Sequence, residues 1–310
     1  MLAHEPVMVA EVVARLAAAQ GGRFVDCTVG AGGHSRALLE AGAARIIGLD
    51  RDLEALAVAE ATLAPWASQV ELVHADFREL GDVLRRRAVA TVDGVLADLG
   101  LSSMQVDAEG RGFSFRRDEP LDMRMDRTSG PDAATLVARA SERELADVIY
   151  RYGEERYARR IARAIVSARA RGPIETTGQL AAIVRRVVWR SGGRIDPATR
   201  TFQAVRIWVN AELEGLDRFL REAVSWLRPQ GRLVAIAFHS LEDRIVKQTL
   251  RQLATDPPRQ VALLTKRPVM PDDEEVTRNP RARSAKLRAA ERLGRLQGEG
   301  PEGASLRSPA

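Results

Sequence analysis

Short apolar runs and longer amphipathic segments alternate over the first hundred residues of the chain. Four of the runs are largely apolar and bounded by Gly or Asp, which is typical of parallel strands buried on both faces. Between them, residues 34–41 and 53–63 have helical composition, and Gly42 stands where the first helix would end. The pattern predicts strands at 23–28, 44–49, 70–74 and 92–97. Strands and helices in this alternation predict a doubly wound, Rossmann-like α/β domain.

The pattern becomes helical after Asp98. Residues 100–130 are rich in Gly, Asp, Arg and Met and show no clear period, so we predict a loop there. Five helices are predicted after this loop, at 132–140, 142–150, 154–171, 177–190 and 197–213. An all-helical segment therefore interrupts the α/β domain.

The α/β pattern resumes near residue 217. A helix at 217–227, a strand at 232–238 and edge strands at 261–266 and 285–293 are predicted. The last residues are rich in Gly, Ser and Pro, which predicts a disordered tail. We therefore divide the chain into an α/β domain in two parts (1–103 and 211–293), an inserted loop-plus-helical domain (104–210) and the tail (294–310).

Composition excludes several classes of protein. Hydrophobic residues make up 45% of the 310 and charged residues 29%, the balance of a soluble globular protein. No apolar run approaches the roughly 20 residues of a membrane-spanning helix, and the acidic, Pro-containing N-terminus is unlike a signal peptide. Cys27 is the one cysteine and the four histidines lack finger spacing, so we expect no disulfide and no metal. These features predict a reduced, cytoplasmic protein.

Positive charge is concentrated in one part of the chain. The formal net charge is +5, yet residues 151–206 contain 13 Arg against four acids, and the remainder is mildly acidic. Arginine favours planar, bidentate contacts with phosphate, so a dense patch indicates nucleic acid. A solvated helix face in an arginine-rich protein would give the same count. Charge alone leaves both interpretations open.

A glycine-rich turn follows the first predicted strand. The dinucleotide-binding pattern G-x-G-x-x-G is met at Gly30 and Gly32 but fails at its third position, which is Ser35. No Lys follows the glycines, which excludes a phosphate-binding P-loop. Backbone amides in such a turn approach a ligand closely, and the helix start favours its anionic groups.

Polar residues end the other predicted strands. Asp50, about 20 residues beyond the turn, is placed to hold two ribose hydroxyls, and Asp76-Phe77 offers an acceptor and a ring to an adenine. The remaining candidates are an NAD enzyme and an S-adenosylmethionine (SAM) methyltransferase. The imperfect third glycine argues against a pyrophosphate. Asp26 would suit the positively charged amine of SAM, and Asp98 would lie beneath its methyl group.

Several long runs resemble the bacterial ribosomal small-subunit methyltransferase H family, and the resemblance covers nearly the whole chain. They are VDCTVGAGGHSRALL (25–39), DLGLSSMQ (98–105), RGFSFR (111–116), PLDMRMD (120–126), YGEERYARRIARAI (152–165), ATRTFQAVRIWVNAEL (198–213), FHSLEDRIVK (238–247) and NPRARSAKLRAAER (279–292). Members of this family transfer a methyl group from SAM to the exocyclic amine of one cytosine in the decoding centre of 16S rRNA. The resemblance implies a class I SAM-dependent methyltransferase domain carrying an inserted helical domain that shares in substrate recognition. It also implies a substrate that is the small ribosomal subunit or a late precursor.

The resemblance also implies a set of cofactor-binding positions. The turn would hold the amino-acid end of SAM, the second strand end its ribose, the third its adenine, and the fourth its methionine and methyl region. The corresponding residues are Gly32, Gly33, His34, Asp50, Phe77, Asp98 and Gln105. For catalysis, an acceptor must draw on an amine N–H as the nitrogen lone pair localises. Asp98, the Leu99 carbonyl and Ser102 are the candidates.

One departure concerns the substrate base. DNA amino-methyltransferases usually carry an Asp/Asn/Ser-Pro-Pro-aromatic motif at this strand end, whereas residues 98–103 read DLGLSS. The base clamp must therefore come from elsewhere, and Phe113 and Phe115 are candidate stacking rings, although burial in a core would explain them equally well. We expect Trp189, Phe202 and Trp208 to be core residues of the helical domain.

Two alternatives stay open on the sequence. The first is a ribosome assembly factor that keeps the SAM fold without transfer, and the second is a DNA amino-methyltransferase, weakened by the missing motif. His239 and Ser240 suggest a hydrolase triad, but no G-x-S-x-G elbow surrounds the serine. We instead expect this run to end a strand facing the substrate, with Asp243 and Arg244 paired to each other.

Overall fold

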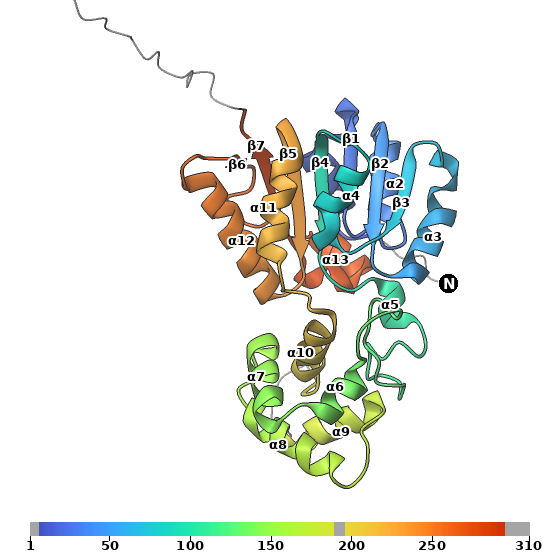
Figure 1. Cartoon of the computed structure of the whole chain (residues 1–310), viewed down its shortest axis with the longest axis vertical. Helices are drawn as coiled ribbons and strands as arrows, with labels where there is room; N and C mark the ends of the chain where they lie inside the picture. Colours follow the sequence, from blue (N-terminus) through green and yellow to red (C-terminus); the bar gives the residue numbers. More distant parts are fainter. Residues whose placement is uncertain (1–5, 189–195, 295–310) are drawn as a thin grey trace, which may run out of the picture.

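A seven-stranded sheet organises the protein (Figure 1), seen in a computed structural model that describes residues 6–188 and 196–294. The strand order is β3-β2-β1-β4-β5-β7-β6. The first five strands are mutually parallel, and β7 runs antiparallel to both of its neighbours. The strands are β1 (Arg23–Asp26), β2 (Arg45–Asp50), β3 (Val70–His74), β4 (Val92–Asp98), β5 (Leu227–Ala237), β6 (Val261–Leu263) and β7 (Lys286–Arg292).

Helices cover both faces of this sheet, because its strands are apolar on both sides. Alternate residues divide between two cores: Val25, for example, faces one and Phe24 the other. The first core is closed by α4 (Leu80–Arg86), α11 (Leu216–Trp226) and α12 (Ser240–Thr255). The second is closed by α1 (Val9–Leu16), α2 (Gly33–Glu40) and α3 (Leu53–Leu63). The predicted doubly wound fold is confirmed.

Five of the described helices between β4 and α11 form a separate body below the sheet in Figure 1. Their apolar faces meet in a third core that shares no buried residue with the other two. The helices are α6 (Ala133–Arg139), α7 (Glu142–Gly153), α8 (Ala158–Arg169), α9 (Thr177–Val187) and α10 (Thr199–Asn210). The predicted helical insertion is therefore present.

The structure adds elements that periodicity did not reveal. The predicted loop at 100–130 contains a short helix, α5 (Ser103–Asp107), and α1, α4, α12 and α13 (Asp273–Arg278) were not predicted either. The strand predicted at 285–293 is not at an edge, since β7 lies between β5 and β6. No described helix has the length and apolar character needed to cross a membrane. Except for Gly294, the predicted disordered tail lies outside the described residues.

The phenylalanines and Trp208 of the insertion pack in or against its core. Phe202 is buried and Trp208 is partly buried in the third core, as expected, while Trp189 lies outside the described residues. Phe113 is only 9% exposed in the same core, and the ring of Phe115 packs edge-on against that of Phe202 at 4.7 Å. Phe113 is enclosed in the third core and Phe115 packs against it, so the structure favours the core interpretation over the stacking one.

Candidate functional site

A cavity of about 470 Å³ lies at the carboxyl ends of the parallel strands, between the sheet and the helical insertion. Sheet order sets the order of its lining: Phe77 follows β3, Asp50 ends β2, Gly30 follows β1, Asp98 ends β4 and Phe238 follows β5. This is the position where open α/β sheets bind ligands, at the point where strand order reverses. Most of the residues predicted from sequence as site residues meet here.

The glycine turn between β1 and α2 is shaped by close packing. Gly32 has a φ of 85°, and a side chain there would also press on Leu63, 3.1 Å from its Cγ. A Cβ on Gly33 would stand 2.8 Å from Pro6 Cγ. Gly33 and His34 line the cavity, whereas Gly32 is absent from its described lining. Gly32 thus serves the turn, while Gly33 and His34 line the cavity.

Asp50 is fixed by two backbone amides. Its Oδ2 accepts from Gly30 N at 2.8 Å and its Oδ1 from Asp52 N at 2.9 Å. Burial is the largest influence on this carboxyl and raises its pKa to about 6, although both hydrogen bonds act in the opposite direction. Asp50 lines the cavity between the glycine turn and the end of β3, and its ribose role stays a prediction.

Asp26 does not take the place expected from the sequence. It is 1% exposed, accepts from Ser35 Oγ at 2.8 Å and from Thr28 N at 3.2 Å, and is not part of the described cavity lining. Its carboxylate therefore joins the end of β1 to the first turn of α2. The structure makes Asp26 a support of the glycine turn rather than a contact for a ligand amine.

Asp98 is the carboxylate with spare hydrogen-bonding capacity. Its Oδ1 is buried and has no hydrogen-bond partner among the described residues, and its Oδ2 lies 3.7 Å from Nδ1 of His34. Burial raises the pKa of this carboxyl to about 6. His34 Nε2 donates to the carbonyl of Val7 at 2.8 Å, so a neutral His34 would offer only a lone pair to Asp98. Because Asp98 lines the cavity, this unused acceptor capacity fits a ligand that brings a donor.

Ser102 and Gln105 form a capping box at the start of α5. Ser102 Oγ accepts from Met104 N at 3.2 Å, and Gln105 Oε1 accepts from Ser102 N at 3.1 Å. Gln105 Nε2 also donates to Asp52 Oδ2 at 2.9 Å, and Arg111 donates to the same oxygen at 2.7 Å. Both Ser102 and Gln105 line the cavity, yet their side chains already hold α5 in place.

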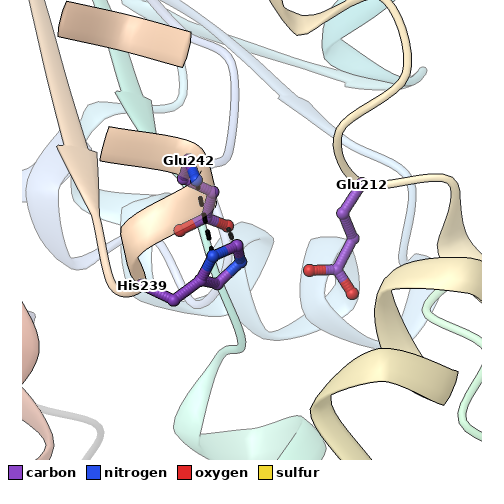
Figure 2. Close-up of side chains that lie close together, drawn as sticks. All are labelled: Glu212, His239 and Glu242. Carbon is purple, nitrogen blue, oxygen red and sulfur yellow. Dashed lines mark hydrogen bonds and ion pairs between the residues drawn. The ribbon is translucent and has the colours of Figure 1, made fainter. Parts of the chain in front are cut away.

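One wall of the cavity comes from residues that sequence reasoning did not assign. Arg206 on α10, Glu212 after it, Phe238 after β5 and Glu242 on α12 all line the cavity. Figure 2 shows Glu212 and Glu242 facing the same space from opposite sides, with His239 beside Glu242. In the sequence, these four residues lie in two of the runs that resemble the family, at 198–213 and 238–247. Those runs were the signal that could have pointed to them.

The charged run after β5 is arranged differently from the prediction. Asp243 accepts from Arg288 Nε at 2.7 Å, while Arg244 donates to Glu154 Oε1 at 3.0 Å, so the two neighbours do not pair with each other. Ser240 Oγ donates to the other oxygen of Glu154 at 2.6 Å. Glu154 therefore ties the end of α7 to the start of α12, and the serine hydroxyl is part of that bridge.

The arginine-rich surface follows α8. Arg159, Arg160 and Arg163 are exposed, and among the described residues only Arg163 has an ion-pair partner, Glu142 at 3.5 Å. Arg160 also lies over the ring of Tyr157, 5.6 Å from its centroid. These cations are thus largely available to an external anion.

Three groups nearby are close enough to suggest a cation site. Ligand atoms of Glu212, His239 and Glu242 all lie within 4.8 Å of one another. Both oxygens of Glu212, however, already accept from Arg206, at 2.9 and 2.8 Å. A guanidinium therefore already supplies the positive charge at this position.

Comparison with known proteins agrees with this architecture. The chain is 52% identical to the ribosomal RNA small subunit methyltransferase H of Bradyrhizobium diazoefficiens over 93% of its length and 91% of that protein. It is 50% identical to the protein of the same name from Thermomicrobium roseum, over 94% of each chain. An rRNA methylase structure from Streptococcus thermophilus aligns with a TM-score of 0.41 at 11% identity over 92% of this chain and 94% of that one, a similarity too distant to support a functional comparison. The model of the MraW methylase family matches residues 1–293, and the chain belongs to that family.

Proposed function

We propose that the protein transfers a methyl group from SAM to the exocyclic amine of a cytosine in the 16S rRNA of the small ribosomal subunit. The observation that carries this proposal is the buried, unsatisfied Oδ1 of Asp98 at the end of β4, between a glycine-rich turn and a wall of the helical insertion. Such a carboxylate, midway along a ligand cavity, can face both a cationic cofactor and an amine substrate. The relatives' name, ribosomal RNA small subunit methyltransferase H, supplies the substrate class.

The residues at the strand ends fit the cofactor. When bound, SAM supplies an electrophilic methyl on a sulfonium. Gly33 and His34 would hold its amino-acid end, Asp50 its ribose hydroxyls and Phe77 its adenine, in the order that β1, β2 and β3 take in the sheet. Gly32 would keep the turn open, and Asp98 with Gln105 would border the methionine and methyl region. Phe77 is itself braced by Phe219, with ring centroids 4.9 Å apart.

Catalysis requires a hydrogen-bond acceptor close to the exocyclic amine of the target cytosine. A cytosine amine is a weak nucleophile because its lone pair is delocalised, so withdrawing an N–H assists attack. Asp98 is the stronger candidate, since its Oδ1 has no partner among the described residues. Ser102 is the second candidate, but its Oγ already caps α5. The target base must leave its stack to reach this depth.

The insertion and its surface suit a large substrate. We propose that residues 104–210 recognise the small subunit or a late precursor, through the exposed arginines of α8. A substrate of this kind would place the protein in the cytoplasm.

Methyl transfer from isotopically labelled SAM tests the proposal directly. Unmodified small subunits, naked 16S rRNA and duplex DNA would be offered separately, and the labelled nucleoside identified by mass spectrometry after digestion. We expect N4-methylcytidine, from small subunits alone. Label in DNA would favour a DNA amino-methyltransferase, and bound SAM with no label in any substrate would favour a non-catalytic assembly factor.

A further inference from the structure

The sheet order divides the cavity into two ends. The proposed cofactor contacts occupy the ends of β3, β2 and β1, so the substrate base is left the side of β4 and β5. Arg206, Glu212, Phe238 and Glu242 line that side. Arg206 and Glu212 come from α10 and the segment after it, so the insertion contributes directly to this part of the cavity.

Arg206 is fixed on this side of the cavity, and one nitrogen of its guanidinium is unused. Its Nε donates to Glu212 Oε1 at 2.9 Å and its Nη2 to Glu212 Oε2 at 2.8 Å. The side chains are only 16% and 7% exposed, so the guanidinium has a fixed orientation. Nη1 makes no hydrogen bond within the described part of the chain, and it belongs to a residue that lines the cavity. The bidentate pair thus fixes a guanidinium that lines the substrate side and keeps one unused donor group.

A carboxylate acceptor and a buried imidazole lie beside this guanidinium. Glu242 is 2% exposed and accepts from Phe238 N at 2.9 Å, which leaves further acceptor capacity. His239 Nδ1 accepts from Glu242 N at 3.4 Å, so its proton is on Nε2. This buried Nε2 lies 3.1 Å from Glu242 Oε1 but makes no well-directed hydrogen bond among the described residues. Figure 2 shows the imidazole beside Glu242, with Glu212 across from them. His239 is not part of the described cavity lining, so Arg206 is the donor of this wall and the two glutamates are its acceptors.

This combination of a donor and acceptors is complementary to the Watson–Crick edge of cytosine. Enzymes that act on an extruded base read it through hydrogen bonds to its Watson–Crick edge. Cytosine presents an amine donor followed by two acceptors, N3 and O2, whereas uracil presents a carbonyl where cytosine has the amine. Asp98 and Glu242 suit the amine, and a carbonyl facing two carboxylates would be repelled. The remaining acceptors require cationic or N–H donors.

We propose that Arg206 is a specificity-determining residue of the reaction, whose Nη1 donates to the O2 of the target cytosine. The inference rests on the proposed function and deepens it by assigning the base contact. Glu212 is then a positioning residue that acts through Arg206. The insertion would complete the base site, in addition to attracting RNA through its surface.

The test changes the protein donor and the base acceptor together. Small subunits are reconstituted with 16S rRNA carrying either cytidine or 2-thiocytidine at the target position, because sulfur is the weaker acceptor. The test variant is Arg206→Met combined with Glu212→Gln, which removes the donor without leaving a buried carboxylate unpaired. The matched control is Arg85→Met combined with Glu222→Gln, which makes the same two changes in an ion pair between α4 and α11 that is not part of the described cavity lining. The rate of methyl transfer and the affinity for subunits in the presence of S-adenosylhomocysteine are both measured.

The informative quantity is the ratio between the two substrates. For the natural protein and the control we expect cytidine to be favoured about tenfold or more, the effect of a hydrogen bond to a charged group. The double variant should lose that preference while its affinity for SAM stays unchanged. A merely structural role would slow both substrates equally and keep the ratio, which would overturn the inference. Absence of transfer by the natural protein would contradict the proposed function instead, and the binding ratio would still decide the role of Arg206.

Discussion

The imidazole of His34 lies with Nδ1 3.7 Å from Oδ2 of Asp98, joining the glycine turn to the end of β4. Its other nitrogen donates to the carbonyl of Val7, which fixes the ring. The contact therefore places a histidine lone pair, or a shared proton, next to a buried carboxylate. That arrangement makes the protonation state of Asp98 central to the behaviour of the site.

The ionised carboxylate of Asp98 should lower the free energy of unfolding of the ligand-free protein. Burial raises the pKa of Asp98 to about 6, so the folded state binds its proton more tightly than the unfolded state. The contribution of Asp98 to the free energy of unfolding must then fall as pH rises from about 4 to about 6. We expect Asp98→Asn to stabilise the protein at pH 8 by up to about 3 kcal/mol, and much less at pH 4.5. Denaturant titrations at both pH values measure this, and a gain independent of pH would contradict it.

Asp50 should control cofactor affinity. Asp50→Ala removes the proposed ribose acceptor and the hydrogen bonds that it accepts from Gly30 N in the turn and from Asp52 N before α3. We therefore expect SAM binding to weaken by about 30-fold while binding of small subunits is retained. Asp82→Ala, at an exposed position on α4, is the control. Calorimetric titration with SAM measures the change. Unaltered affinity in Asp50→Ala would show that the ribose lies elsewhere.

The arginines of α8 should set the salt dependence of substrate binding. Removing one cation that binds a phosphate lowers the slope of log affinity against log salt by about 0.7–0.9. Replacing Arg159, Arg160 and Arg163 by Ala should therefore flatten that slope by about 2 when the affinity for small subunits is measured across salt concentrations. The paired change Arg85→Ala with Arg86→Ala, on α4, should leave the slope as it is. An unchanged slope in the α8 variant would show that these arginines form a solvated helix face and do not bind phosphates.

Phe113 should behave as a core residue. Its side chain is almost fully enclosed in the third core, so Phe113→Ala is expected to destabilise the protein by about 3 kcal/mol. Phe113→Leu refills most of the space and should retain the rate of methyl transfer. Thermal unfolding and transfer assays together test this. A large loss of rate in Phe113→Leu without loss of stability would restore the stacking role.

Much of the fold was available from the sequence because its signals are local. The segment Leu53–Leu63 is a helix within the bounds that its composition predicted, and β3 likewise agrees with its apolar run. The short helix α5 was missed because it is held by a capping box and by Asp52, 53 residues away from Gln105. Periodicity cannot register a helix of five residues whose stability depends on such interactions.

The hydrogen-bond partners of the charged residues in and around the cavity could not be predicted from local sequence either. The sequence placed an acid or a ring at each strand end, since parallel strands bring their carboxyl ends to one edge. It could not show that Asp26 turns away into the protein while Asp98 keeps an unsatisfied oxygen. Nor could it show that Asp243 and Arg244, adjacent in the chain, take different partners. Such outcomes depend on side-chain direction and on burial, which follow from the packing of distant elements.

By itself, the sequence determined the α/β alternation, the helical insertion, the glycine turn and the acids that follow the strands. Those features depend on periodicity, composition and spacing along a single stretch of chain. Only the tertiary structure placed the Arg206–Glu212 pair at the end of α10 beside Glu242 of α12. Hydrogen bonding and desolvation act between neighbours in space, so which charges are paired and which stay available is decided when the chain has folded.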